Sequence, residues 1–278
     1  MSFAAKKSLG QHFLLNPSTI DKILDLASVT FEDHVLEIGP GPGVMTGRLA
    51  ERTQTLIAIE KDRRFAELLR KKFESQPHVE ILEQDFLKWD FRELMKKNSR
   101  WKIVANLPYN VATEILFRLL EHRNRFVSMH LMFQEEVAQR LAAGPGSKHY
   151  GVLSILTQID ADIRIVYRLP PGAFTPPPKV RSAVVELIPL AQPRFTLKDP
   201  FLFRKIVKAA FGQRRKMMVN ALRDQVPELP VETIRTTLES AGLPVTARAE
   251  QAPIEVFARL SGLVRSPAPT LDSPGGSG

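Results

Sequence analysis

Four consecutive residues, Asn106-Leu107-Pro108-Tyr109, follow an apolar run at 101–105 and are expected where a buried strand ends. They can hold a flat ring with an exocyclic amine, because Asn106 Oδ1 and the carbonyl of Leu107 or Pro108 can accept both N–H bonds. The amine lone pair, otherwise delocalised into an adenine-type ring, then points outward, and Tyr109 can stack on the ring. The same residues also fit an ordinary proline-containing turn, so the motif alone leaves both interpretations open.

A glycine-rich turn ends an earlier apolar run. The segment 37–43 reads Glu-Ile-Gly-Pro-Gly-Pro-Gly and leads into a helical pattern. Glycines such as Gly39 and Gly41 let the backbone pass close to a ligand, and the helix start offers free N–H groups. The spacing differs from the dinucleotide fingerprint, and Pro40 and Pro42 lack the N–H groups that a pyrophosphate needs. The turn therefore favours a ligand with an amino-acid or nucleoside part.

Two carboxylates stand at the next strand ends. Glu60 closes the second apolar run, where a carboxylate can accept both hydroxyls of a ribose, and Asp85 follows the third, where one can accept from an adenine amino group. Either residue alone fits a helix cap or a turn. With the glycine turn and Asn106, however, four successive strand ends carry ligand-type residues at the edge where open α/β sheets bind their ligands.

The elements that position these residues follow from hydrophobic periodicity. Strands are expected at 34–38, 55–59, 79–82, 102–105, 126–133, 163–168 and 182–188, and helices at 16–28, 44–52, 62–74, 111–122 and 134–142. This alternation predicts an α/β fold with a doubly wound, mainly parallel sheet. The proline-dense segment 170–179 predicts a loop. Four later helical patterns, at 200–211, 213–224, 231–241 and 250–262, predict a smaller all-α domain.

Composition limits the classes of protein. The 278 residues are 44% hydrophobic and include no cysteine, which excludes disulfides, thiolate chemistry and cysteine-based zinc sites. No apolar stretch approaches the roughly 20 residues that cross a bilayer, so we expect a cytoplasmic protein without a membrane partner. The net charge of +9 favours a polyanionic partner such as nucleic acid, although general basicity without a binding face is the alternative.

Taken together, the segment 37–43, Glu60, Asp85 and Asn106–Tyr109 resemble the S-adenosylmethionine-dependent adenine-N6 methyltransferases. The segment 10–14 (Gly-Gln-His-Phe-Leu) is similar to the N-terminal cofactor-binding segment of ribosomal RNA adenine dimethyltransferases. The segment 173–180 (Ala-Phe-Thr-Pro-Pro-Pro-Lys-Val) is similar to the loop that closes the target-base pocket in the small-subunit branch of that family. The resemblance extends from about Lys7 to Leu263, including 210–216 and 248–250.

The resemblance implies a Rossmann-like methyltransferase domain at 1–190, a helical RNA-binding domain at 195–264 and a disordered tail at 265–278. It implies dimethylation of the N6 amino groups of two adjacent adenosines in the 3′-terminal hairpin loop of small-subunit (16S) rRNA, coupled to subunit biogenesis. The cofactor would be S-adenosyl-L-methionine, with no metal, and the partner the small ribosomal subunit. We expect a monomer.

The implied site residues form three groups. Cofactor contacts map to His12, Leu14, Gly39, Gly41, Glu60, Asp85 and Asn106. Position 12 is often Asn in this family; His12 can still form a hydrogen bond, but the sequence does not define its tautomer. Catalysis is assigned to Asn106, Leu107, Pro108 and Tyr109, with Phe174 covering the other face of the base. Candidates for RNA contact are Lys148, His149, Lys179, Arg181, Arg214, Arg215 and Lys216, although the run 214–216 equally fits a solvated helix face.

Three alternatives stay open. The large-subunit erythromycin-resistance branch usually reads Asn-Ile-Pro-Tyr, whereas Asn-Leu-Pro-Tyr-Asn and the triple-proline loop of this chain favour the small-subunit enzymes. A DNA adenine methyltransferase would use a similar Asn-Pro-Tyr device, but the segments 11–14 and 174–179 argue against it. The third alternative is an rRNA-binding assembly factor for which methylation is incidental.

Overall fold

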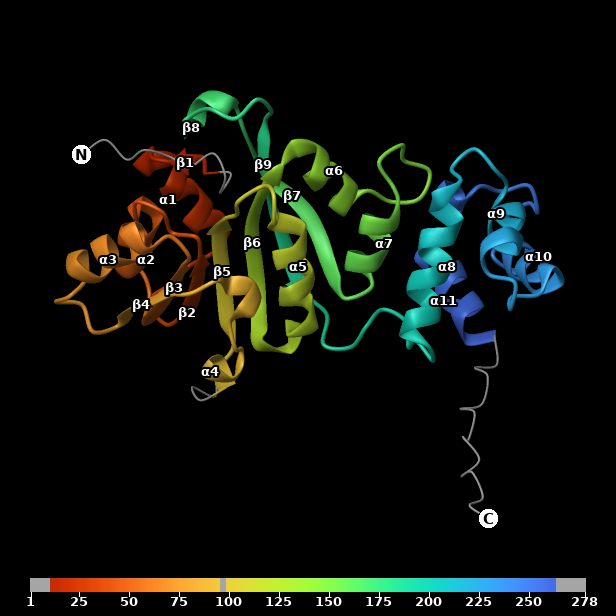
Figure 1. The fold of residues 1–278 in the computed structure, drawn as a ribbon, viewed down its shortest axis with the longest axis horizontal. Coiled ribbons are helices and arrows are strands. Elements are labelled where there is room, and N and C mark those ends of the chain that lie inside the picture. The colour runs from red at the N-terminus through yellow and green to blue at the C-terminus, as the bar shows by residue number, and fades with distance from the viewer. Residues whose placement is uncertain (1–10, 96–98, 264–278) are drawn as a thin grey trace, which may run out of the picture. The chain divides into compact units, whose positions relative to one another are not determined.

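The computed structural model describes residues 11–95 and 99–263 of the chain (Figure 1). By internal contacts they form two compact units. The first unit comprises the residues up to Ala142 and Thr157–Arg194, and the second comprises Ala143–Leu156 and the residues from Phe195 onward. A boundary near 190–195 was expected, but 143–156 group with the second unit, where Tyr150 packs edge-to-face on Phe211. The tail expected at 265–278 lies outside the described residues.

The first unit is built on a seven-stranded sheet with the order β4-β3-β2-β5-β6-β9-β7. Its strands are β2 (His34–Ile38), β3 (Thr55–Glu60), β4 (Val79–Glu83), β5 (Trp101–Asn106), β6 (Phe126–Gln134), β7 (Ala161–Leu169) and β9 (Ser182–Pro189). The first five run parallel, whereas β9 is antiparallel to both of its neighbours, β6 and β7. The predicted doubly wound, mainly parallel sheet is thus confirmed. Strand order reverses between β2 and β5, and such a switch point opens a crevice at the carboxyl ends of the strands.

Helices connect these strands, and their starts follow local capping chemistry. They are α1 (Pro17–Leu26), α2 (Val44–Ala50), α3 (Arg63–Lys72), α4 (Arg92–Met95), α5 (Ala112–Glu121) and α6 (Glu135–Ala142), with α7 (Val152–Gln158) following. Asn16 caps α1 by accepting from Thr19 N at 3.1 Å, and Asp62 caps α3 by accepting from Arg64 N. The sequence patterns did not predict the short helices α4 and α7.

A second, two-stranded pairing joins distant parts of the first unit. β1 (Phe13–Leu14) runs antiparallel to β8 (Phe174–Thr175), with Leu14 opposite Phe174. Both of these side chains are buried in a hydrophobic cluster that includes Ile20 and Leu24 of α1. The proline-dense segment expected as a loop therefore contains one short strand, which fixes it against the segment before α1.

The second unit contains α8 (Pro200–Gly212), α9 (Met218–Gln225), α10 (Val231–Ser240) and α11 (Ile254–Leu263). Their core includes Phe203, Leu222 and Phe257. The helix expected from 213 begins only at Met218, because the backbone leaves the helical region at Gln213 (φ −128°, ψ 61°) and stays extended at Met217. The run 214–216 consequently lies in the connection between two helices rather than on a helix face.

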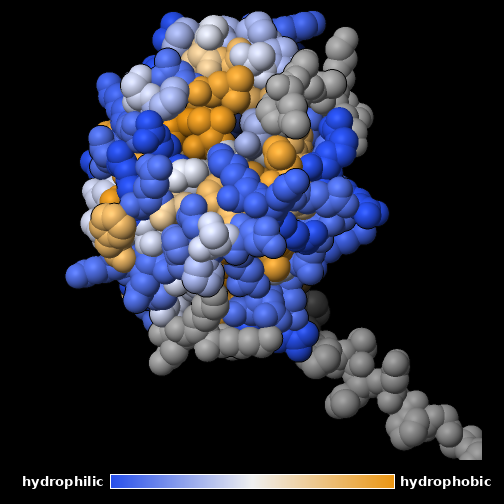
Figure 2. All heavy atoms as spheres, turned by 90° about the vertical axis from the view of Figure 1, so that its left-hand side faces the viewer, coloured by the Kyte–Doolittle hydropathy of each residue, from blue (hydrophilic) through white to orange (hydrophobic). Residues whose placement is uncertain are grey.

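Viewed from the side of α2 and α3, the surface is predominantly hydrophilic, with hydrophobic side chains gathered in limited areas (Figure 2). Within residues 11–95 and 99–263, no helix has the length and apolar character that a bilayer crossing requires.

Candidate functional site

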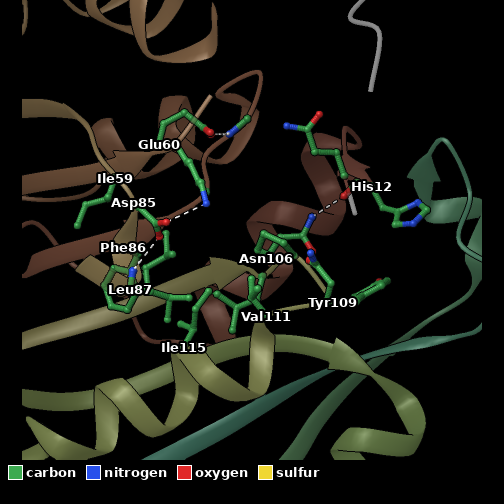
Figure 3. Close-up of a pocket in the computed structure, with 18 of the residues that line it drawn as sticks. His12, Ile59, Glu60, Asp85, Phe86, Leu87, Asn106, Tyr109, Val111 and Ile115 are labelled. Carbon is green, nitrogen blue, oxygen red and sulfur yellow. Dashed lines mark hydrogen bonds and ion pairs between the residues drawn. The ribbon is translucent and has the colours of Figure 1, made fainter. Parts of the chain in front are cut away.

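A pocket with a cavity volume of about 140 Å³ lies in the first unit, at the carboxyl ends of four parallel strands (Figure 3). Ile38 of β2, Glu60 of β3 and Asn106 of β5 end their strands at its wall, and Asp85 lies two residues beyond β4. These are the strand ends on which the sequence analysis placed ligand-type residues. Strand order brings the side chains together although they are far apart in the chain.

The glycine turn has a backbone that side chains rarely adopt. Gly39, Gly41 and Gly43 have φ values of 67°, 56° and 75°, in the left-handed region. A Cβ at Gly41 would lie 2.9 Å from the Phe13 ring, so glycine is needed there for space as well as for conformation. Gly39 and Gly41 line the pocket, and the turn exposes backbone to the cavity. Gly43 caps α2.

Glu60 holds the glycine turn and the start of α3 in place. Its Oε2 accepts from Gly41 N at 2.9 Å and its Oε1 from Asp62 N at 2.7 Å. Burial raises the pKa of this carboxyl, which is 5% exposed, and the two backbone donors partly oppose that shift. Each carboxyl oxygen has two acceptor sites, so both can still accept a hydroxyl group from a ligand in the pocket.

Behind the turn lies a second buried carboxyl that the sequence analysis did not single out. Glu37 is 2% exposed, and burial raises its pKa to about 8. The hydroxyl of Thr46 opposes this shift and the charge of nearby Glu60 reinforces it. Glu37 does not line the pocket, and its effect there passes through the glycine turn that follows it.

Asp85 is a charged acceptor at the pocket wall. Its Oδ1 accepts from Leu87 N at 3.1 Å, and its Oδ2 lies 2.8 Å from Lys61 Nζ. The hydrogen bond from Lys61 is the main reason why the pKa of Asp85 is lowered. Lys61 itself lines the pocket. It directly follows Glu60 in sequence, a signal that would have identified it.

The amide of Asn106 has a defined orientation. Its Nδ2 donates to the backbone carbonyl of His12 at 2.8 Å, so Oδ1, the acceptor, is at the other end of the amide. Leu107 is buried, and Pro108 packs against the glycine turn, with its Cδ 3.8 Å from the position of a Cβ on Gly39. Asn106, Leu107 and Pro108 all line the pocket.

Tyr109 is held at both ends. Its hydroxyl is 2.5 Å from Ser182 Oγ at the start of β9, and its ring stacks on the His12 ring with centroids 5.6 Å apart and an interplanar angle of 26°. Burial raises the pKa of the phenol, so Tyr109 is neutral at physiological pH. Ser182 is fully buried. No local sequence signal marks it as the partner of Tyr109.

His12 acts through its backbone and its ring in different directions. The ring points away from Glu60 and Asp85 (Figure 3), and its Nδ1 is 2.8 Å from the carbonyl oxygen of Pro176. A carbonyl only accepts, so Nδ1 carries the proton, which assigns the tautomer that the sequence left undefined. His12 thereby connects the Asn106 amide with the proline-dense segment.

Two predicted site residues are not brought to the pocket. Leu14 and Phe174 are 6% and 3% exposed and pack in the hydrophobic cluster under β1 and β8. Neither side chain is among the residues that line the cavity, whereas Phe13 lines it. The pairing of β1 with β8 explains this, because it turns the two side chains toward the core. For Phe174 to cover a base, the segment 174–175 would have to turn its ring out of this cluster.

The candidate RNA contacts fall into two groups. Lys179 and Arg181 are exposed in the first unit, where Arg181 pairs with Glu135 at 3.1 Å. The second unit holds Lys148, His149, Arg214, Arg215 and Lys216. Arg214 donates to the carbonyls of Lys148 and Tyr150, so Lys148 and Arg214 lie side by side.

The pocket residues fit a nucleoside with an attached amino acid. Carboxylates suited to ribose hydroxyls and an amino group stand at Glu60 and Asp85, apolar walls come from Ile59 and Phe86, and the glycine turn allows a close backbone approach. Among the described residues, no group of three or more histidine and acidic side chains is arranged to hold a metal ion.

Comparison with known proteins gives concordant results. The model of the family described as ribosomal RNA adenine dimethylase matches residues 2–263. The chain is 44% identical over 259 residues to ribosomal RNA small subunit methyltransferase A of Geobacter sulfurreducens, covering 92% of this chain and 94% of that protein. The crystal structure of a dimethyladenosine transferase from Plasmodium falciparum matches with a TM-score of 0.75 at 27% identity, covering 90% of this chain and 96% of that one. The 23S rRNA methyltransferase ErmE matches with a TM-score of 0.71 at 25% identity, covering 90% and 98%.

Proposed function

The chain belongs to the ribosomal RNA adenine dimethylase family and is an S-adenosylmethionine-dependent rRNA adenine dimethyltransferase; we propose that its Asn106–Tyr109 turn orients the N6 amino groups of two adjacent adenosines in the 3′-terminal hairpin loop of 16S rRNA. The observation that carries this proposal is the fixed Asn106 amide at the wall of the cofactor-type pocket. The small subunit is favoured because a relative with 44% identity is named for it, whereas the fold alone matches proteins named for either subunit.

S-adenosylmethionine supplies a methyl group already activated by its sulfonium centre, so the protein's task is positioning. Glu60 is placed to accept the ribose hydroxyls and Asp85 the adenine amino group of the cofactor. Gly39 and Gly41 leave room for the amino-acid part. Lys61 occupies Asp85 Oδ2 at 2.8 Å and moves aside when an amino group takes that acceptor.

On the substrate side, Asn106 Oδ1 and the carbonyl of Leu107 or Pro108 accept the two N–H bonds of the target amine, which directs its lone pair at the methyl carbon. The new N–C bond forms as the C–S bond breaks, the leaving group is a neutral thioether, and the methylated amine then loses its proton to water. Tyr109 stacks on the base from the position that Ser182 fixes. Phe174 covers the other face only after it leaves the cluster in which it is buried.

The first unit is proposed as the catalytic domain and the second as an RNA-binding domain. Every residue that lines the pocket lies in the first unit, so one copy of the chain suffices for catalysis and a cytoplasmic monomer is proposed. Five of the candidate RNA contacts lie in the second unit, which makes binding and chemistry separable by mutation. A role in small-subunit biogenesis then predicts that an inactive Asn106→Ala protein still binds immature subunits.

Incubation with labelled S-adenosylmethionine and unmethylated small subunits, large subunits or DNA tests the substrate assignment. We expect label in the small subunit alone, and primer extension stopping at two adjacent adenosines. Label confined to large subunits or to DNA, or a stop at a single unpaired adenosine, would contradict the proposal.

A further inference from the structure

The first half of α8 presents an aromatic ring among cations. Phe201 is 87% exposed, although Phe203, two residues further on, is 1% exposed in the core of the second unit. Phe201, Arg204, Lys205 and Lys208 are spaced three and four residues apart, so they share one side of the helix. All four are exposed, and they are called here the α8 outer face.

A groove runs beside the α8 outer face. It encloses about 560 Å³ and is lined by Phe201, Arg204, Lys205, Lys208, Ala209 and Gln225. Gln225 is the last residue of α9, so both walls of the groove belong to the second unit. The pocket of the first unit shares no residue with it.

The cations of this face differ in how they are balanced. Lys205 Nζ is 2.5 Å from Glu228 Oε1, and this pair lowers the pKa of Glu228. Arg204 and Lys208 form no ion pair within the part of the chain that the structure describes. They are four residues apart on one helix, where like charges repel each other. A partner with closely spaced negative charges would offset that repulsion.

An exposed apolar side chain alone has no functional meaning, because most proteins carry some. Its surroundings distinguish Phe201. Phe31 is 72% exposed, but its neighbours in sequence are Glu32 and Asp33, which repel phosphates. Proteins that bind single-stranded nucleic acid combine aromatic rings, on which bases stack, with lysine and arginine that follow the backbone.

We propose that the α8 outer face binds a single-stranded segment of the substrate RNA, with one base stacked on Phe201 and phosphates contacted by Arg204 and Lys208. This inference rests on the proposed function for the nature of the polyanion, and it adds a contact surface beyond the candidates at 148 and 214–216. A protein partner would need apolar area, whereas this face offers a single ring amid charge.

The test uses the full chain and two RNA probes, a short single-stranded oligouridine and unmethylated small ribosomal subunits. Phe201→Ala should weaken oligouridine binding at least about fivefold, the lower bound for loss of one stacked base, and Phe201→Trp should restore it. Arg204→Gln combined with Lys208→Gln should lower the slope of log affinity against log salt by about one to two, as expected for one or two lost phosphate contacts. Both sets should also bind small subunits more weakly.

Matched controls separate this surface from general effects. Phe31→Ala removes an exposed phenylalanine, and Arg63→Gln with Lys71→Gln removes two exposed cations from α3. Both controls should bind RNA as the unchanged protein does. Cofactor affinity, measured by calorimetry, should be the same for all variants, and their thermal midpoints should show that they are folded.

The inference is overturned if the Phe201 and Arg204/Lys208 variants bind oligouridine with unchanged affinity and salt slope. It is also overturned if they lose only subunit binding, which would assign the face to a ribosomal protein, or if the α3 controls weaken binding equally. Methylation of small subunits by the unchanged protein tests the proposed function separately, because the oligouridine measurement needs no methyl transfer.

Discussion

The side-chain nitrogen of Asn106 donates to the backbone carbonyl of His12 at 2.8 Å, across 94 residues of sequence. Because a carbonyl only accepts, this bond selects one of the two orientations of the amide. His12 in turn donates from its ring to Pro176, so the orienting amide, the segment before α1 and the proline-dense segment are connected through one residue. The relation makes Asn106 a preorganised acceptor rather than a free side chain.

Replacing Asn106 should therefore separate chemistry from cofactor binding. Asn106→Ala should lower the rate of methyl transfer at least about a hundredfold, the usual cost of losing one preorganised hydrogen-bonding group at a reacting centre. Its cofactor affinity, measured by calorimetry, should change much less than that of Gly39→Arg, which fills the glycine turn. An active Asn106→Ala enzyme would refute the role of the amide.

The pair of Tyr109 and Ser182 should be coupled in stability. Ser182→Ala leaves the half-buried phenol without its partner and should destabilise the protein by about 1 kcal/mol, as should Tyr109→Phe. The double variant should cost clearly less than the sum, and denaturant unfolding of all four proteins measures the coupling. Methyl transfer should fall more for Tyr109→Ala, which removes the stacking ring, than for Tyr109→Phe. Additive single effects would show that the hydroxyl contact does not position the ring.

Lys61 should control the ionisation of Asp85. Removing it as Lys61→Met takes away the main cause that lowers the pKa of Asp85, so this pKa should rise. A lowered pKa of a carboxyl adds stability that is present above the unfolded pKa and is lost as pH falls through the folded one, and the variant should lose this contribution at higher pH. Carboxyl titration by NMR measures the shift directly. Lys88→Met, which removes a smaller cause of the same sign, should shift the pKa less; an equal shift would contradict the assignment.

The strand-end residues could be predicted because residue type and periodicity are local properties. Glu60 and Asn106 close strands that their own apolar runs define, and parallel order then brings them to one edge. The burial of Phe174 was not accessible in this way, because it depends on a pairing with Leu14 that joins segments 160 residues apart. The start of α9 was missed for a related reason: Gly212 and the backbone at Gln213 interrupt a pattern that looks continuously helical.

Partners of the site residues were the least predictable part. Ser182 is an unremarkable serine at the start of a strand until β9 inserts between β6 and β7 and brings it to Tyr109. The tautomer of His12 likewise depends on Pro176, which no local pattern relates to it. Side-chain partners that come from antiparallel insertion and from loops leave no periodic signal in the sequence.

Glu37 should make stability depend on pH. Its pKa is about 8 in the folded protein against an ordinary value of 4.5, because burial disfavours the charged form. The folded state thus binds this proton more tightly than the unfolded chain does. The contribution is fully present below about pH 4.5 and is lost as pH rises through about 8.

Glu37→Gln removes this titration while keeping the shape of the side chain. The stability of the variant relative to the unchanged protein should increase as pH rises from about 4.5 to about 8 and level off above that, by a few kcal/mol in total at roughly 1.4 kcal/mol per pKa unit. Denaturant unfolding at a series of pH values measures the difference, and Glu74→Gln at an exposed glutamate controls for the loss of charge alone. A difference that stays flat across this range would mean that Glu37 is ionised in the folded protein at neutral pH, held by a cation that the glycine turn brings to it.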